Sequence, residues 1–113
     1  MNFRLDGKIA VVTGASRGIG RGIAIALAGT GATVICAARD LSKLKEVVAE
    51  IGAAGGTASA QVVDVASRES IEGLVASTIG IHGRLDVLVN NAGITRDNLL
   101  LRMKPADWDD VLA

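Results

Sequence analysis

Three closely spaced glycines, between an apolar segment and a helical one, have the composition of a phosphate-binding turn. Gly14, Gly18 and Gly20 follow the apolar run KIAVV with the spacing Gly-x3-Gly-x-Gly. Glycines permit a tight turn and let the backbone approach a pyrophosphate, whose charge meets the N–H groups and dipole of a helix start. Ser16 adds a hydroxyl donor and Arg17 a cation. A plain strand-to-helix turn is the alternative, but the strand-turn-helix context favours a dinucleotide cradle.

The end of the second apolar segment bears on which dinucleotide would bind. An NAD site usually places a carboxylate about 20 residues beyond the cradle, where it holds the ribose 2′-hydroxyl. Here Ala38 occupies that place and Arg39 follows it. A planar guanidinium can bind the oxygens of a 2′-phosphate bidentately, so NADP is favoured over NAD. The alternative is a solvated Arg39 that pairs with Asp40 or with a helix.

Further polar residues follow the third and fourth apolar segments. Asp64 could accept from an adenine amine, because open α/β sheets bind ligands along the carboxyl edge of their strands. A helix-capping Asp64 is the alternative. The sequence Asn90-Asn91-Ala92-Gly93 ends the fourth segment; small residues allow close approach of a ligand, and an asparagine side chain can tie strand ends together. Taken alone, NNAG is equally typical of a turn.

The elements that must position these residues alternate along the chain. Apolar strands are expected at 8–12, 33–37, 57–63 and 85–89, and amphipathic helices between them. Asp40 and Ser67 are expected to cap the second and third helices, and a last helix is expected from Pro105 onward. The third helix is expected to carry one stripe of residues on a single face: Ile71, Leu74, Val75 and Thr78. Strands separated by such helices must be parallel. The sequence therefore predicts one α/β domain over residues 1–113, with a Rossmann-like doubly wound sheet.

Composition argues against several other classes of protein. Half of the 113 residues are apolar and the formal net charge is zero, which gives no reason to expect nucleic-acid or membrane partners. The segment MNFRLDGK lacks the apolar core of a signal peptide, so a cytoplasmic location is expected. Cys36 is alone and lies in an apolar strand, so a small buried side chain is expected and a metal site is not. His82, in the polar segment IHGR, is expected in a surface loop.

The motifs Thr13-Gly14-x3-Gly18-x-Gly20 and Asn90-Asn91-Ala92-Gly93 together closely resemble the short-chain dehydrogenase/reductase family. The string NNAGITRDNLLLRMKPADWDDVL is similar to the 3-oxoacyl-[acyl-carrier-protein] reductase branch of that family. The resemblance implies the strand order 3-2-1-4. It also implies these cofactor contacts: Gly14, Ser16, Arg17, Gly18, Ile19, Gly20, Arg39, Asp64, Val65, Asn91, Ala92 and Gly93.

The resemblance covers about the first half of such an enzyme. Family members use a Ser, a Tyr and a Lys in a Tyr-x3-Lys arrangement, helped by an Asn, but this sequence contains no tyrosine. No catalytic residue carries over, and NADP(H) binding without turnover is therefore expected. Two alternatives stay open: a fragment of an active NADPH-dependent ketoacyl reductase that needs its other half, and a self-assembling half-domain that binds no cofactor.

Self-association is expected because the outer edge of the fourth strand would be bare. Unpaired N–H and C=O groups along the segment LDVLV, and apolar side chains such as Trp108, invite pairing with another chain. The expected partner is a second copy, joined through the fourth strand or the last helix.

Overall fold

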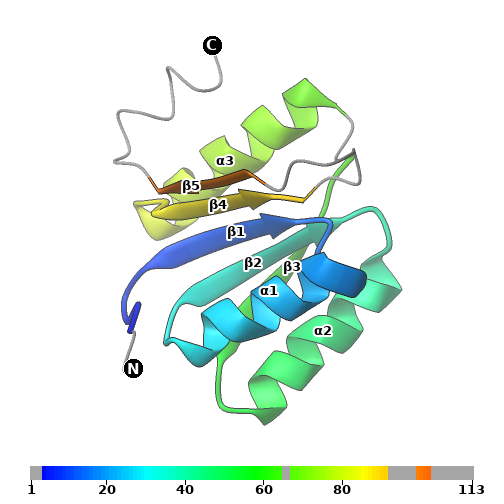
Figure 1. Ribbon diagram of the computed structural model, residues 1–113. Helices are drawn as coiled ribbons and strands as arrows, with labels where there is room; N and C mark the ends of the chain where they lie inside the picture. The colour runs from blue at the N-terminus through cyan, green and yellow to red at the C-terminus, as the bar shows by residue number, and fades with distance from the viewer. Residues whose placement is uncertain (1–3, 65–66, 92–98, 103–113) are drawn as a thin grey trace.

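A single five-stranded sheet organises the computed structural model, which describes residues 4–64, 67–91 and 99–102 (Figure 1). The strand order is β3-β2-β1-β4-β5. The strands are β1 Ile9–Thr13, β2 Thr33–Ala38, β3 Thr57–Val62, β4 Val87–Asn90 and β5 Leu99–Arg102. The first four are parallel, so their carboxyl ends lie at one edge of the sheet. This arrangement confirms the predicted α/β doubly wound sheet and its 3-2-1-4 order.

Helices cover both faces of the sheet. α1 (Gly18–Gly29) and α2 (Leu41–Ala53) lie on one face, and α3 (Arg68–His82) lies on the other (Figure 1). The two predicted caps are present. The Asp40 carboxylate accepts from the Lys43 N–H at 3.2 Å, and the Ser67 hydroxyl accepts from the Ser70 N–H at 3.2 Å. The last helix expected from Pro105, with Trp108 on it, lies outside the described residues.

The core consists of two apolar layers, because successive side chains of a strand point to opposite faces. Val12 and Val34 pack in the layer beneath α1 and α2, whereas Val11 and Ile35 pack in the layer beneath α3. The predicted buried stripe of α3 is confirmed in full: Ile71, Leu74, Val75 and Thr78. Branched and small side chains fill these layers, as expected for strands covered on both faces.

The expectation of a bare outer edge on the fourth strand is wrong. β5 pairs antiparallel with β4, placing Asn90 opposite Leu99 and Val87 opposite Arg102. An antiparallel neighbour needs only a short connection, unlike the long crossovers of parallel strands. The sheet edge of β4 therefore gives no reason to expect a second copy there. His82 is also not in a loop: it is the last residue of α3, and it is exposed.

Asp86 anchors β4 to β1 just before β4 begins. Its Oδ2 accepts from the Ile9 N–H at 2.8 Å, and its own N–H donates to the Ile9 carbonyl at 2.9 Å. Arg84 donates to both carboxylate oxygens, at 2.8 and 2.7 Å. Burial raises the pKa of Asp86, but the hydrogen bonds from Arg84 and Ile9 outweigh it, so the pKa lies below its usual value. The carboxylate is therefore held charged at a half-buried position.

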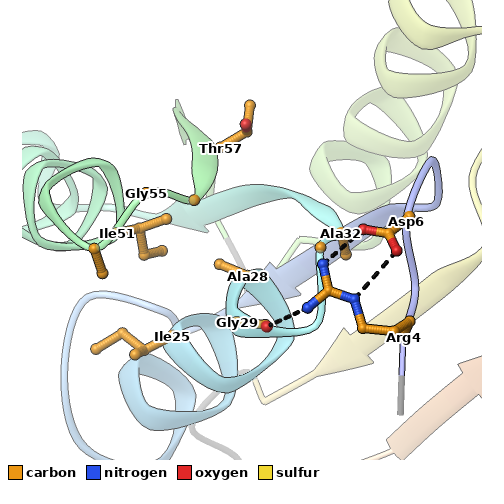
Figure 2. A pocket seen from close by; sticks show the side chains of 12 residues that line it. Arg4, Asp6, Ile25, Ala28, Gly29, Ala32, Ile51, Gly55 and Thr57 are labelled. Carbon is orange, nitrogen blue, oxygen red and sulfur yellow. Dashed lines mark hydrogen bonds and ion pairs between the residues drawn. The ribbon is translucent and has the colours of Figure 1, made fainter. Parts of the chain in front are cut away.

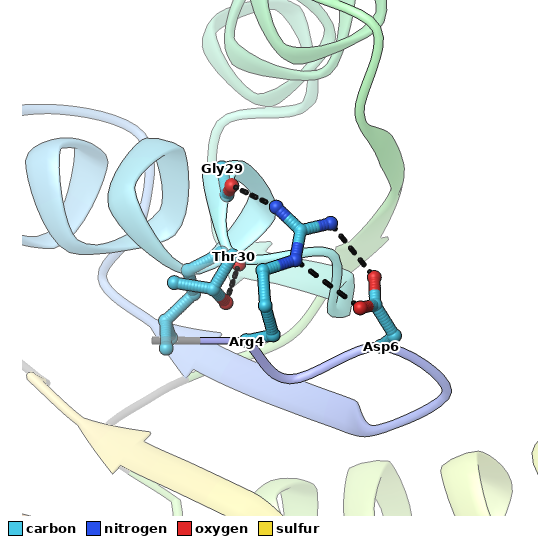
Figure 3. Close-up of polar contacts among 5 residues, drawn as sticks. Arg4, Asp6, Gly29 and Thr30 are labelled. Atoms are coloured by element: carbon cyan, nitrogen blue, oxygen red, sulfur yellow. Dashed lines mark hydrogen bonds and ion pairs between the residues drawn. The ribbon is translucent and has the colours of Figure 1, made fainter. Parts of the chain in front are cut away.

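A groove of about 520 Å³ lies at the opposite, amino-terminal edge of the strands, beside the ends of α1 and α2 (Figure 2). On one side of it the Arg4 guanidinium donates to Asp6 at 2.8 and 3.1 Å and to the Gly29 carbonyl at 3.4 Å (Figures 2 and 3). The Leu5 N–H donates to the Thr30 carbonyl at 2.7 Å. These contacts fasten the chain before β1 to the end of α1.

In the part of the chain that the structure describes, no helix is long and apolar enough to cross a membrane.

Candidate functional site

The glycine turn joins the carboxyl end of β1 to the start of α1. Gly14 and Gly18 have φ values of 64° and 61°, in the left-handed region that favours glycine. A Cβ added to Gly14 would overlap the Asn91 carbonyl oxygen, and one added to Gly20 would overlap the Gly14 carbonyl oxygen. A Cβ on Gly18 would meet nothing within 4 Å. Packing inside the chain therefore requires Gly14 and Gly20, whereas Gly18 lies beside open space that a ligand could fill.

The start of α1 differs from the starts of the other two helices. Its N-cap residue, Arg17, makes no side-chain capping hydrogen bond, whereas the side chains of Asp40 and Ser67 cap α2 and α3. The first N–H groups of a helix have no partner within the helix. Ile19, in the first turn, is 66% exposed. The turn thus combines helix N–H groups without a side-chain cap, the half-buried Ser16 and the exposed Arg17, which suits an anionic ligand.

Thr13 joins the ends of β1 and β4, a role that the sequence reasoning missed. Its hydroxyl accepts from the Asn91 N–H at 2.9 Å and donates to the Asn90 Oδ1 at 2.9 Å. Thr13 is fully buried, in register with Ala37 of β2 on one side and Asn90 on the other. The signal was a hydroxyl at the end of an otherwise apolar buried strand, since buried polar groups are almost always hydrogen-bonded. The expectation that an asparagine side chain ties strand ends together is confirmed by Asn90.

Arg39 and Asp64 meet at the carboxyl ends of β2 and β3. The Arg39 Nη2 donates to the Asp64 Oδ1 at 2.7 Å. Both side chains are open to solvent, with exposed fractions of 68% and 51%. Arg39 does not pair with Asp40, whose carboxylate caps α2 and accepts from the Ser42 hydroxyl. The N-cap of α3 is Ser67 instead of Asp64.

The turn and this ion pair lie on the same edge of the sheet. The Ala15 N–H donates to the Ala37 carbonyl at 3.3 Å, two residues before Arg39. An extended ligand could therefore run from the start of α1 across the end of β2 to the end of β3. The structure brings to this edge the predicted site residues Gly14, Ser16, Arg17, Gly18, Ile19, Gly20, Arg39, Asp64 and Asn91. Val65, Ala92 and Gly93 lie outside the described residues.

Cys36 contributes no reactive group to this edge. It is fully buried in β2, and burial raises the pKa of its thiol to about 11. The thiol is therefore protonated at neutral pH, which confirms the expected small buried side chain. Among the described residues no cluster of histidine, cysteine and acidic side chains could hold a metal ion. The groups assembled at the edge are hydrogen-bond donors, cations and one carboxylate, all suited to binding.

Comparison with known proteins places these features in a family. The family model for short chain dehydrogenases matches residues 8–113. A 3-oxoacyl-[acyl-carrier-protein] reductase from Synechocystis sp. is 50% identical over 109 residues, which cover 96% of this chain and 44% of that protein. The enzyme of the same name from Escherichia coli K12 is 49% identical over 112 residues, covering 99% of this chain and 44% of that protein. The chain thus spans less than half the length of these relatives.

Solved structures agree with the sequence comparison. A metagenomic short-chain oxidoreductase in complex with NADP superposes with a TM-score of 0.76 and 49% identity, covering 93% of this chain and 48% of the other. A hydroxysteroid dehydrogenase from Escherichia coli gives a TM-score of 0.72 and 41% identity, covering 78% and 37%.

Proposed function

The chain belongs to the short-chain dehydrogenase family, and from that membership we propose that it binds NADP(H) as the nucleotide-binding part of a reductase of the 3-oxoacyl-[acyl-carrier-protein] type. One observation carries the proposal. The start of α1, without a side-chain cap, and the Arg39 guanidinium lie on the same carboxyl edge of the sheet. A dinucleotide with a 2′-phosphate has anionic groups for both places.

The pyrophosphate is assigned to the turn before α1. Gly18 leaves open space on this turn, and the first N–H groups of α1 supply donors and the positive end of the helix dipole. The Ser16 hydroxyl and the Arg17 guanidinium supply further donors for phosphate oxygens. When bound, the cofactor would supply hydride chemistry, whereas these residues hold and orient it.

The adenosine end is assigned to the ends of β2 and β3. Arg39 would bind the 2′-phosphate, because a guanidinium matches phosphate oxygens bidentately. Asp64, together with Val65, would contact the adenine. Asn91, with Ala92 and Gly93, would border the path toward the nicotinamide.

Calorimetric titration with NADP and with NAD tests the proposal. The unmodified chain should bind NADP more tightly, and Arg39→Ala should remove the preference by weakening NADP alone. Arg4→Ala is the matched control: it removes an exposed, ion-paired arginine at the opposite, amino-terminal edge of the sheet, and should leave both affinities unchanged. Equal affinities of the unmodified chain for NADP and NAD would contradict the assignment of Arg39.

Turnover and self-association need separate measurements. Without a tyrosine, the chain is expected not to oxidise NADPH in the presence of an acetoacetyl thioester, and a rate above background would overturn that expectation but leave the binding proposal intact. Sedimentation at micromolar concentration tests the predicted dimer, whose remaining candidate surface, the helix expected around Trp108, lies outside the described residues. A chain that associates but binds neither nucleotide would favour a structural half-domain.

A further inference from the structure

An ion pair occupies the place where the 2′-phosphate would bind. β2 and β3 pair up to Ala38 and Val62, and the Val63 N–H donates to the Ala38 carbonyl at 3.0 Å. Arg39 and Asp64 follow directly on these two strands, and their side chains meet at 2.7 Å. The strand pairing therefore reaches the residues directly before Arg39 and Asp64 and brings the two side chains together.

We propose that the Asp64 carboxylate competes with the 2′-phosphate for the Arg39 guanidinium, so that Asp64 limits the preference of this site for the phosphorylated dinucleotide. The inference rests on the proposed function. Carboxylate and phosphate oxygens use the same planar fork of N–H donors. A phosphate bound bidentately by Arg39 must share or displace the hydrogen bond that the Arg39 Nη2 now donates to Asp64. Asp64 also places a negative charge next to the incoming phosphate, which opposes its binding.

Exposure of the pair makes this competition reversible and modest. The Arg39 and Asp64 side chains are 68% and 51% exposed, so solvent screens their attraction. Exposed pairs of this kind contribute little, which limits the expected change in preference to about twofold to fivefold. Competition for Arg39 changes the ratio of the affinities for ligands with and without the 2′-phosphate. A hydrogen bond from an adenine amine to Asp64 would instead strengthen the binding of both ligands equally. The ratio is therefore the quantity that isolates the competition.

The experiment compares adenosine 2′,5′-bisphosphate with adenosine 5′-monophosphate, which differ only in the 2′-phosphate. Calorimetry gives both dissociation constants for the unmodified chain, Asp64→Asn, Arg39→Ala and the double variant. Asp64→Asn should raise the preference for the bisphosphate by about twofold to fivefold. In the Arg39→Ala background the same change should alter the preference much less, because the competed guanidinium is gone.

Asp6→Asn is the matched control. Asp6 is an exposed carboxylate that accepts from Arg4 at 2.8 Å at the opposite, amino-terminal edge of the sheet, so the variant makes the same change in net charge away from the carboxyl edge. Its preference should equal that of the unmodified chain. Asp64→Ser, which has neither carboxylate nor amide, should change the preference in the same direction as Asp64→Asn.

Each other outcome overturns the inference in a distinguishable way. An unchanged or lower preference in Asp64→Asn means that Asp64 does not compete for Arg39. An equal rise with and without Arg39 means that Asp64 only repels the phosphate through space. If the unmodified chain binds neither nucleotide, the proposed function fails and the inference fails with it. If the chain prefers the bisphosphate and Arg39→Ala abolishes this preference, but Asp64→Asn has no effect, only the inference fails.

Discussion

Replacing Thr13 by valine tests whether one hydroxyl holds the two central strands together at the candidate site. Valine keeps nearly the same shape but cannot accept from the Asn91 N–H or donate to the Asn90 Oδ1, both 2.9 Å from the Thr13 hydroxyl. The side chain is fully buried, so water cannot take the place of the hydroxyl without a shift of the strands.

The magnitude follows from the groups left without a partner. A hydrogen bond contributes about 1 kcal/mol net, and a buried donor or acceptor without a partner costs about 1–3 kcal/mol. Asn90 and Asn91 are half-buried and keep some access to water, so the lower part of this range applies. We expect Thr13→Val to lower the free energy of unfolding by about 2 kcal/mol. Thr13→Ser keeps the hydroxyl and loses one buried methyl, which costs about 1 kcal/mol.

Urea unfolding followed by circular dichroism measures both variants. Thr78→Val is the matched control, because Thr78 is also buried, at 3% exposure, and its hydroxyl donates to the Leu74 carbonyl at 2.8 Å. That carbonyl also accepts a backbone hydrogen bond within α3. Loss of the Thr78 hydroxyl should therefore change the free energy of unfolding by less than about 0.5 kcal/mol. If Thr13→Val is no more destabilising than Thr13→Ser, the hydroxyl does not tie the strands and the reasoning is refuted.

Three further predictions concern single residues of the described structure. Gly14→Ala should destabilise the chain by more than about 2 kcal/mol in urea unfolding, because the residue has a left-handed backbone and its Cβ would overlap a neighbouring carbonyl. Gly22→Ala, in open space on α1, should instead stabilise the chain by about 0.5–1 kcal/mol. Equal effects of the two variants would contradict the packing argument. Because the folded-state pKa of Asp86 is lowered, its contribution to stability is present above the unfolded pKa of about 4 and lost as pH falls through the folded pKa. Between about pH 6 and about pH 3, the free energy of unfolding should therefore fall less for Asp86→Asn than for the unmodified chain. An equal fall for both would contradict a lowered pKa of Asp86. Cys36, with its pKa of about 11, should react with a disulfide reagent at neutral pH only as fast as the chain unfolds, and rapid labelling of the folded chain would disprove its burial.

Local sequence signals predicted the elements well because they act over a few residues. Asp40 and Ser67 cap their helices as expected, since a cap depends only on the next three positions. The stripe around Leu74 is buried as predicted, because helical periodicity alone selects a face. Strand limits shifted by one or two residues; β4, for instance, begins at Val87 instead of Leu85.

Features that depend on the neighbours of a residue in space could not be predicted in the same way. The pair of Arg39 and Asp64 depends on how β2 and β3 are aligned, and no local pattern gives that register. β5 was missed because its sequence, LLLR, shows no alternation of apolar and polar residues. The requirement for Gly14 likewise depends on the Asn91 carbonyl, which is far away in the sequence.

The contacts behind the glycine turn have a consequence for the order in which the chain folds. Thr13 and Asn91 are 78 positions apart, whereas β1 and β2 pair across the single helix α1. Closing a long loop costs entropy before its contacts form, so the local unit of β1, α1 and β2 is favoured to precede the arrival of β4. A chain at that intermediate stage would have the phosphate-binding turn without the strand behind it. A ligand that binds only the completed edge would then stabilise the fully folded chain over this intermediate. It would thereby offset the entropic cost of closing the long loop between Thr13 and Asn91.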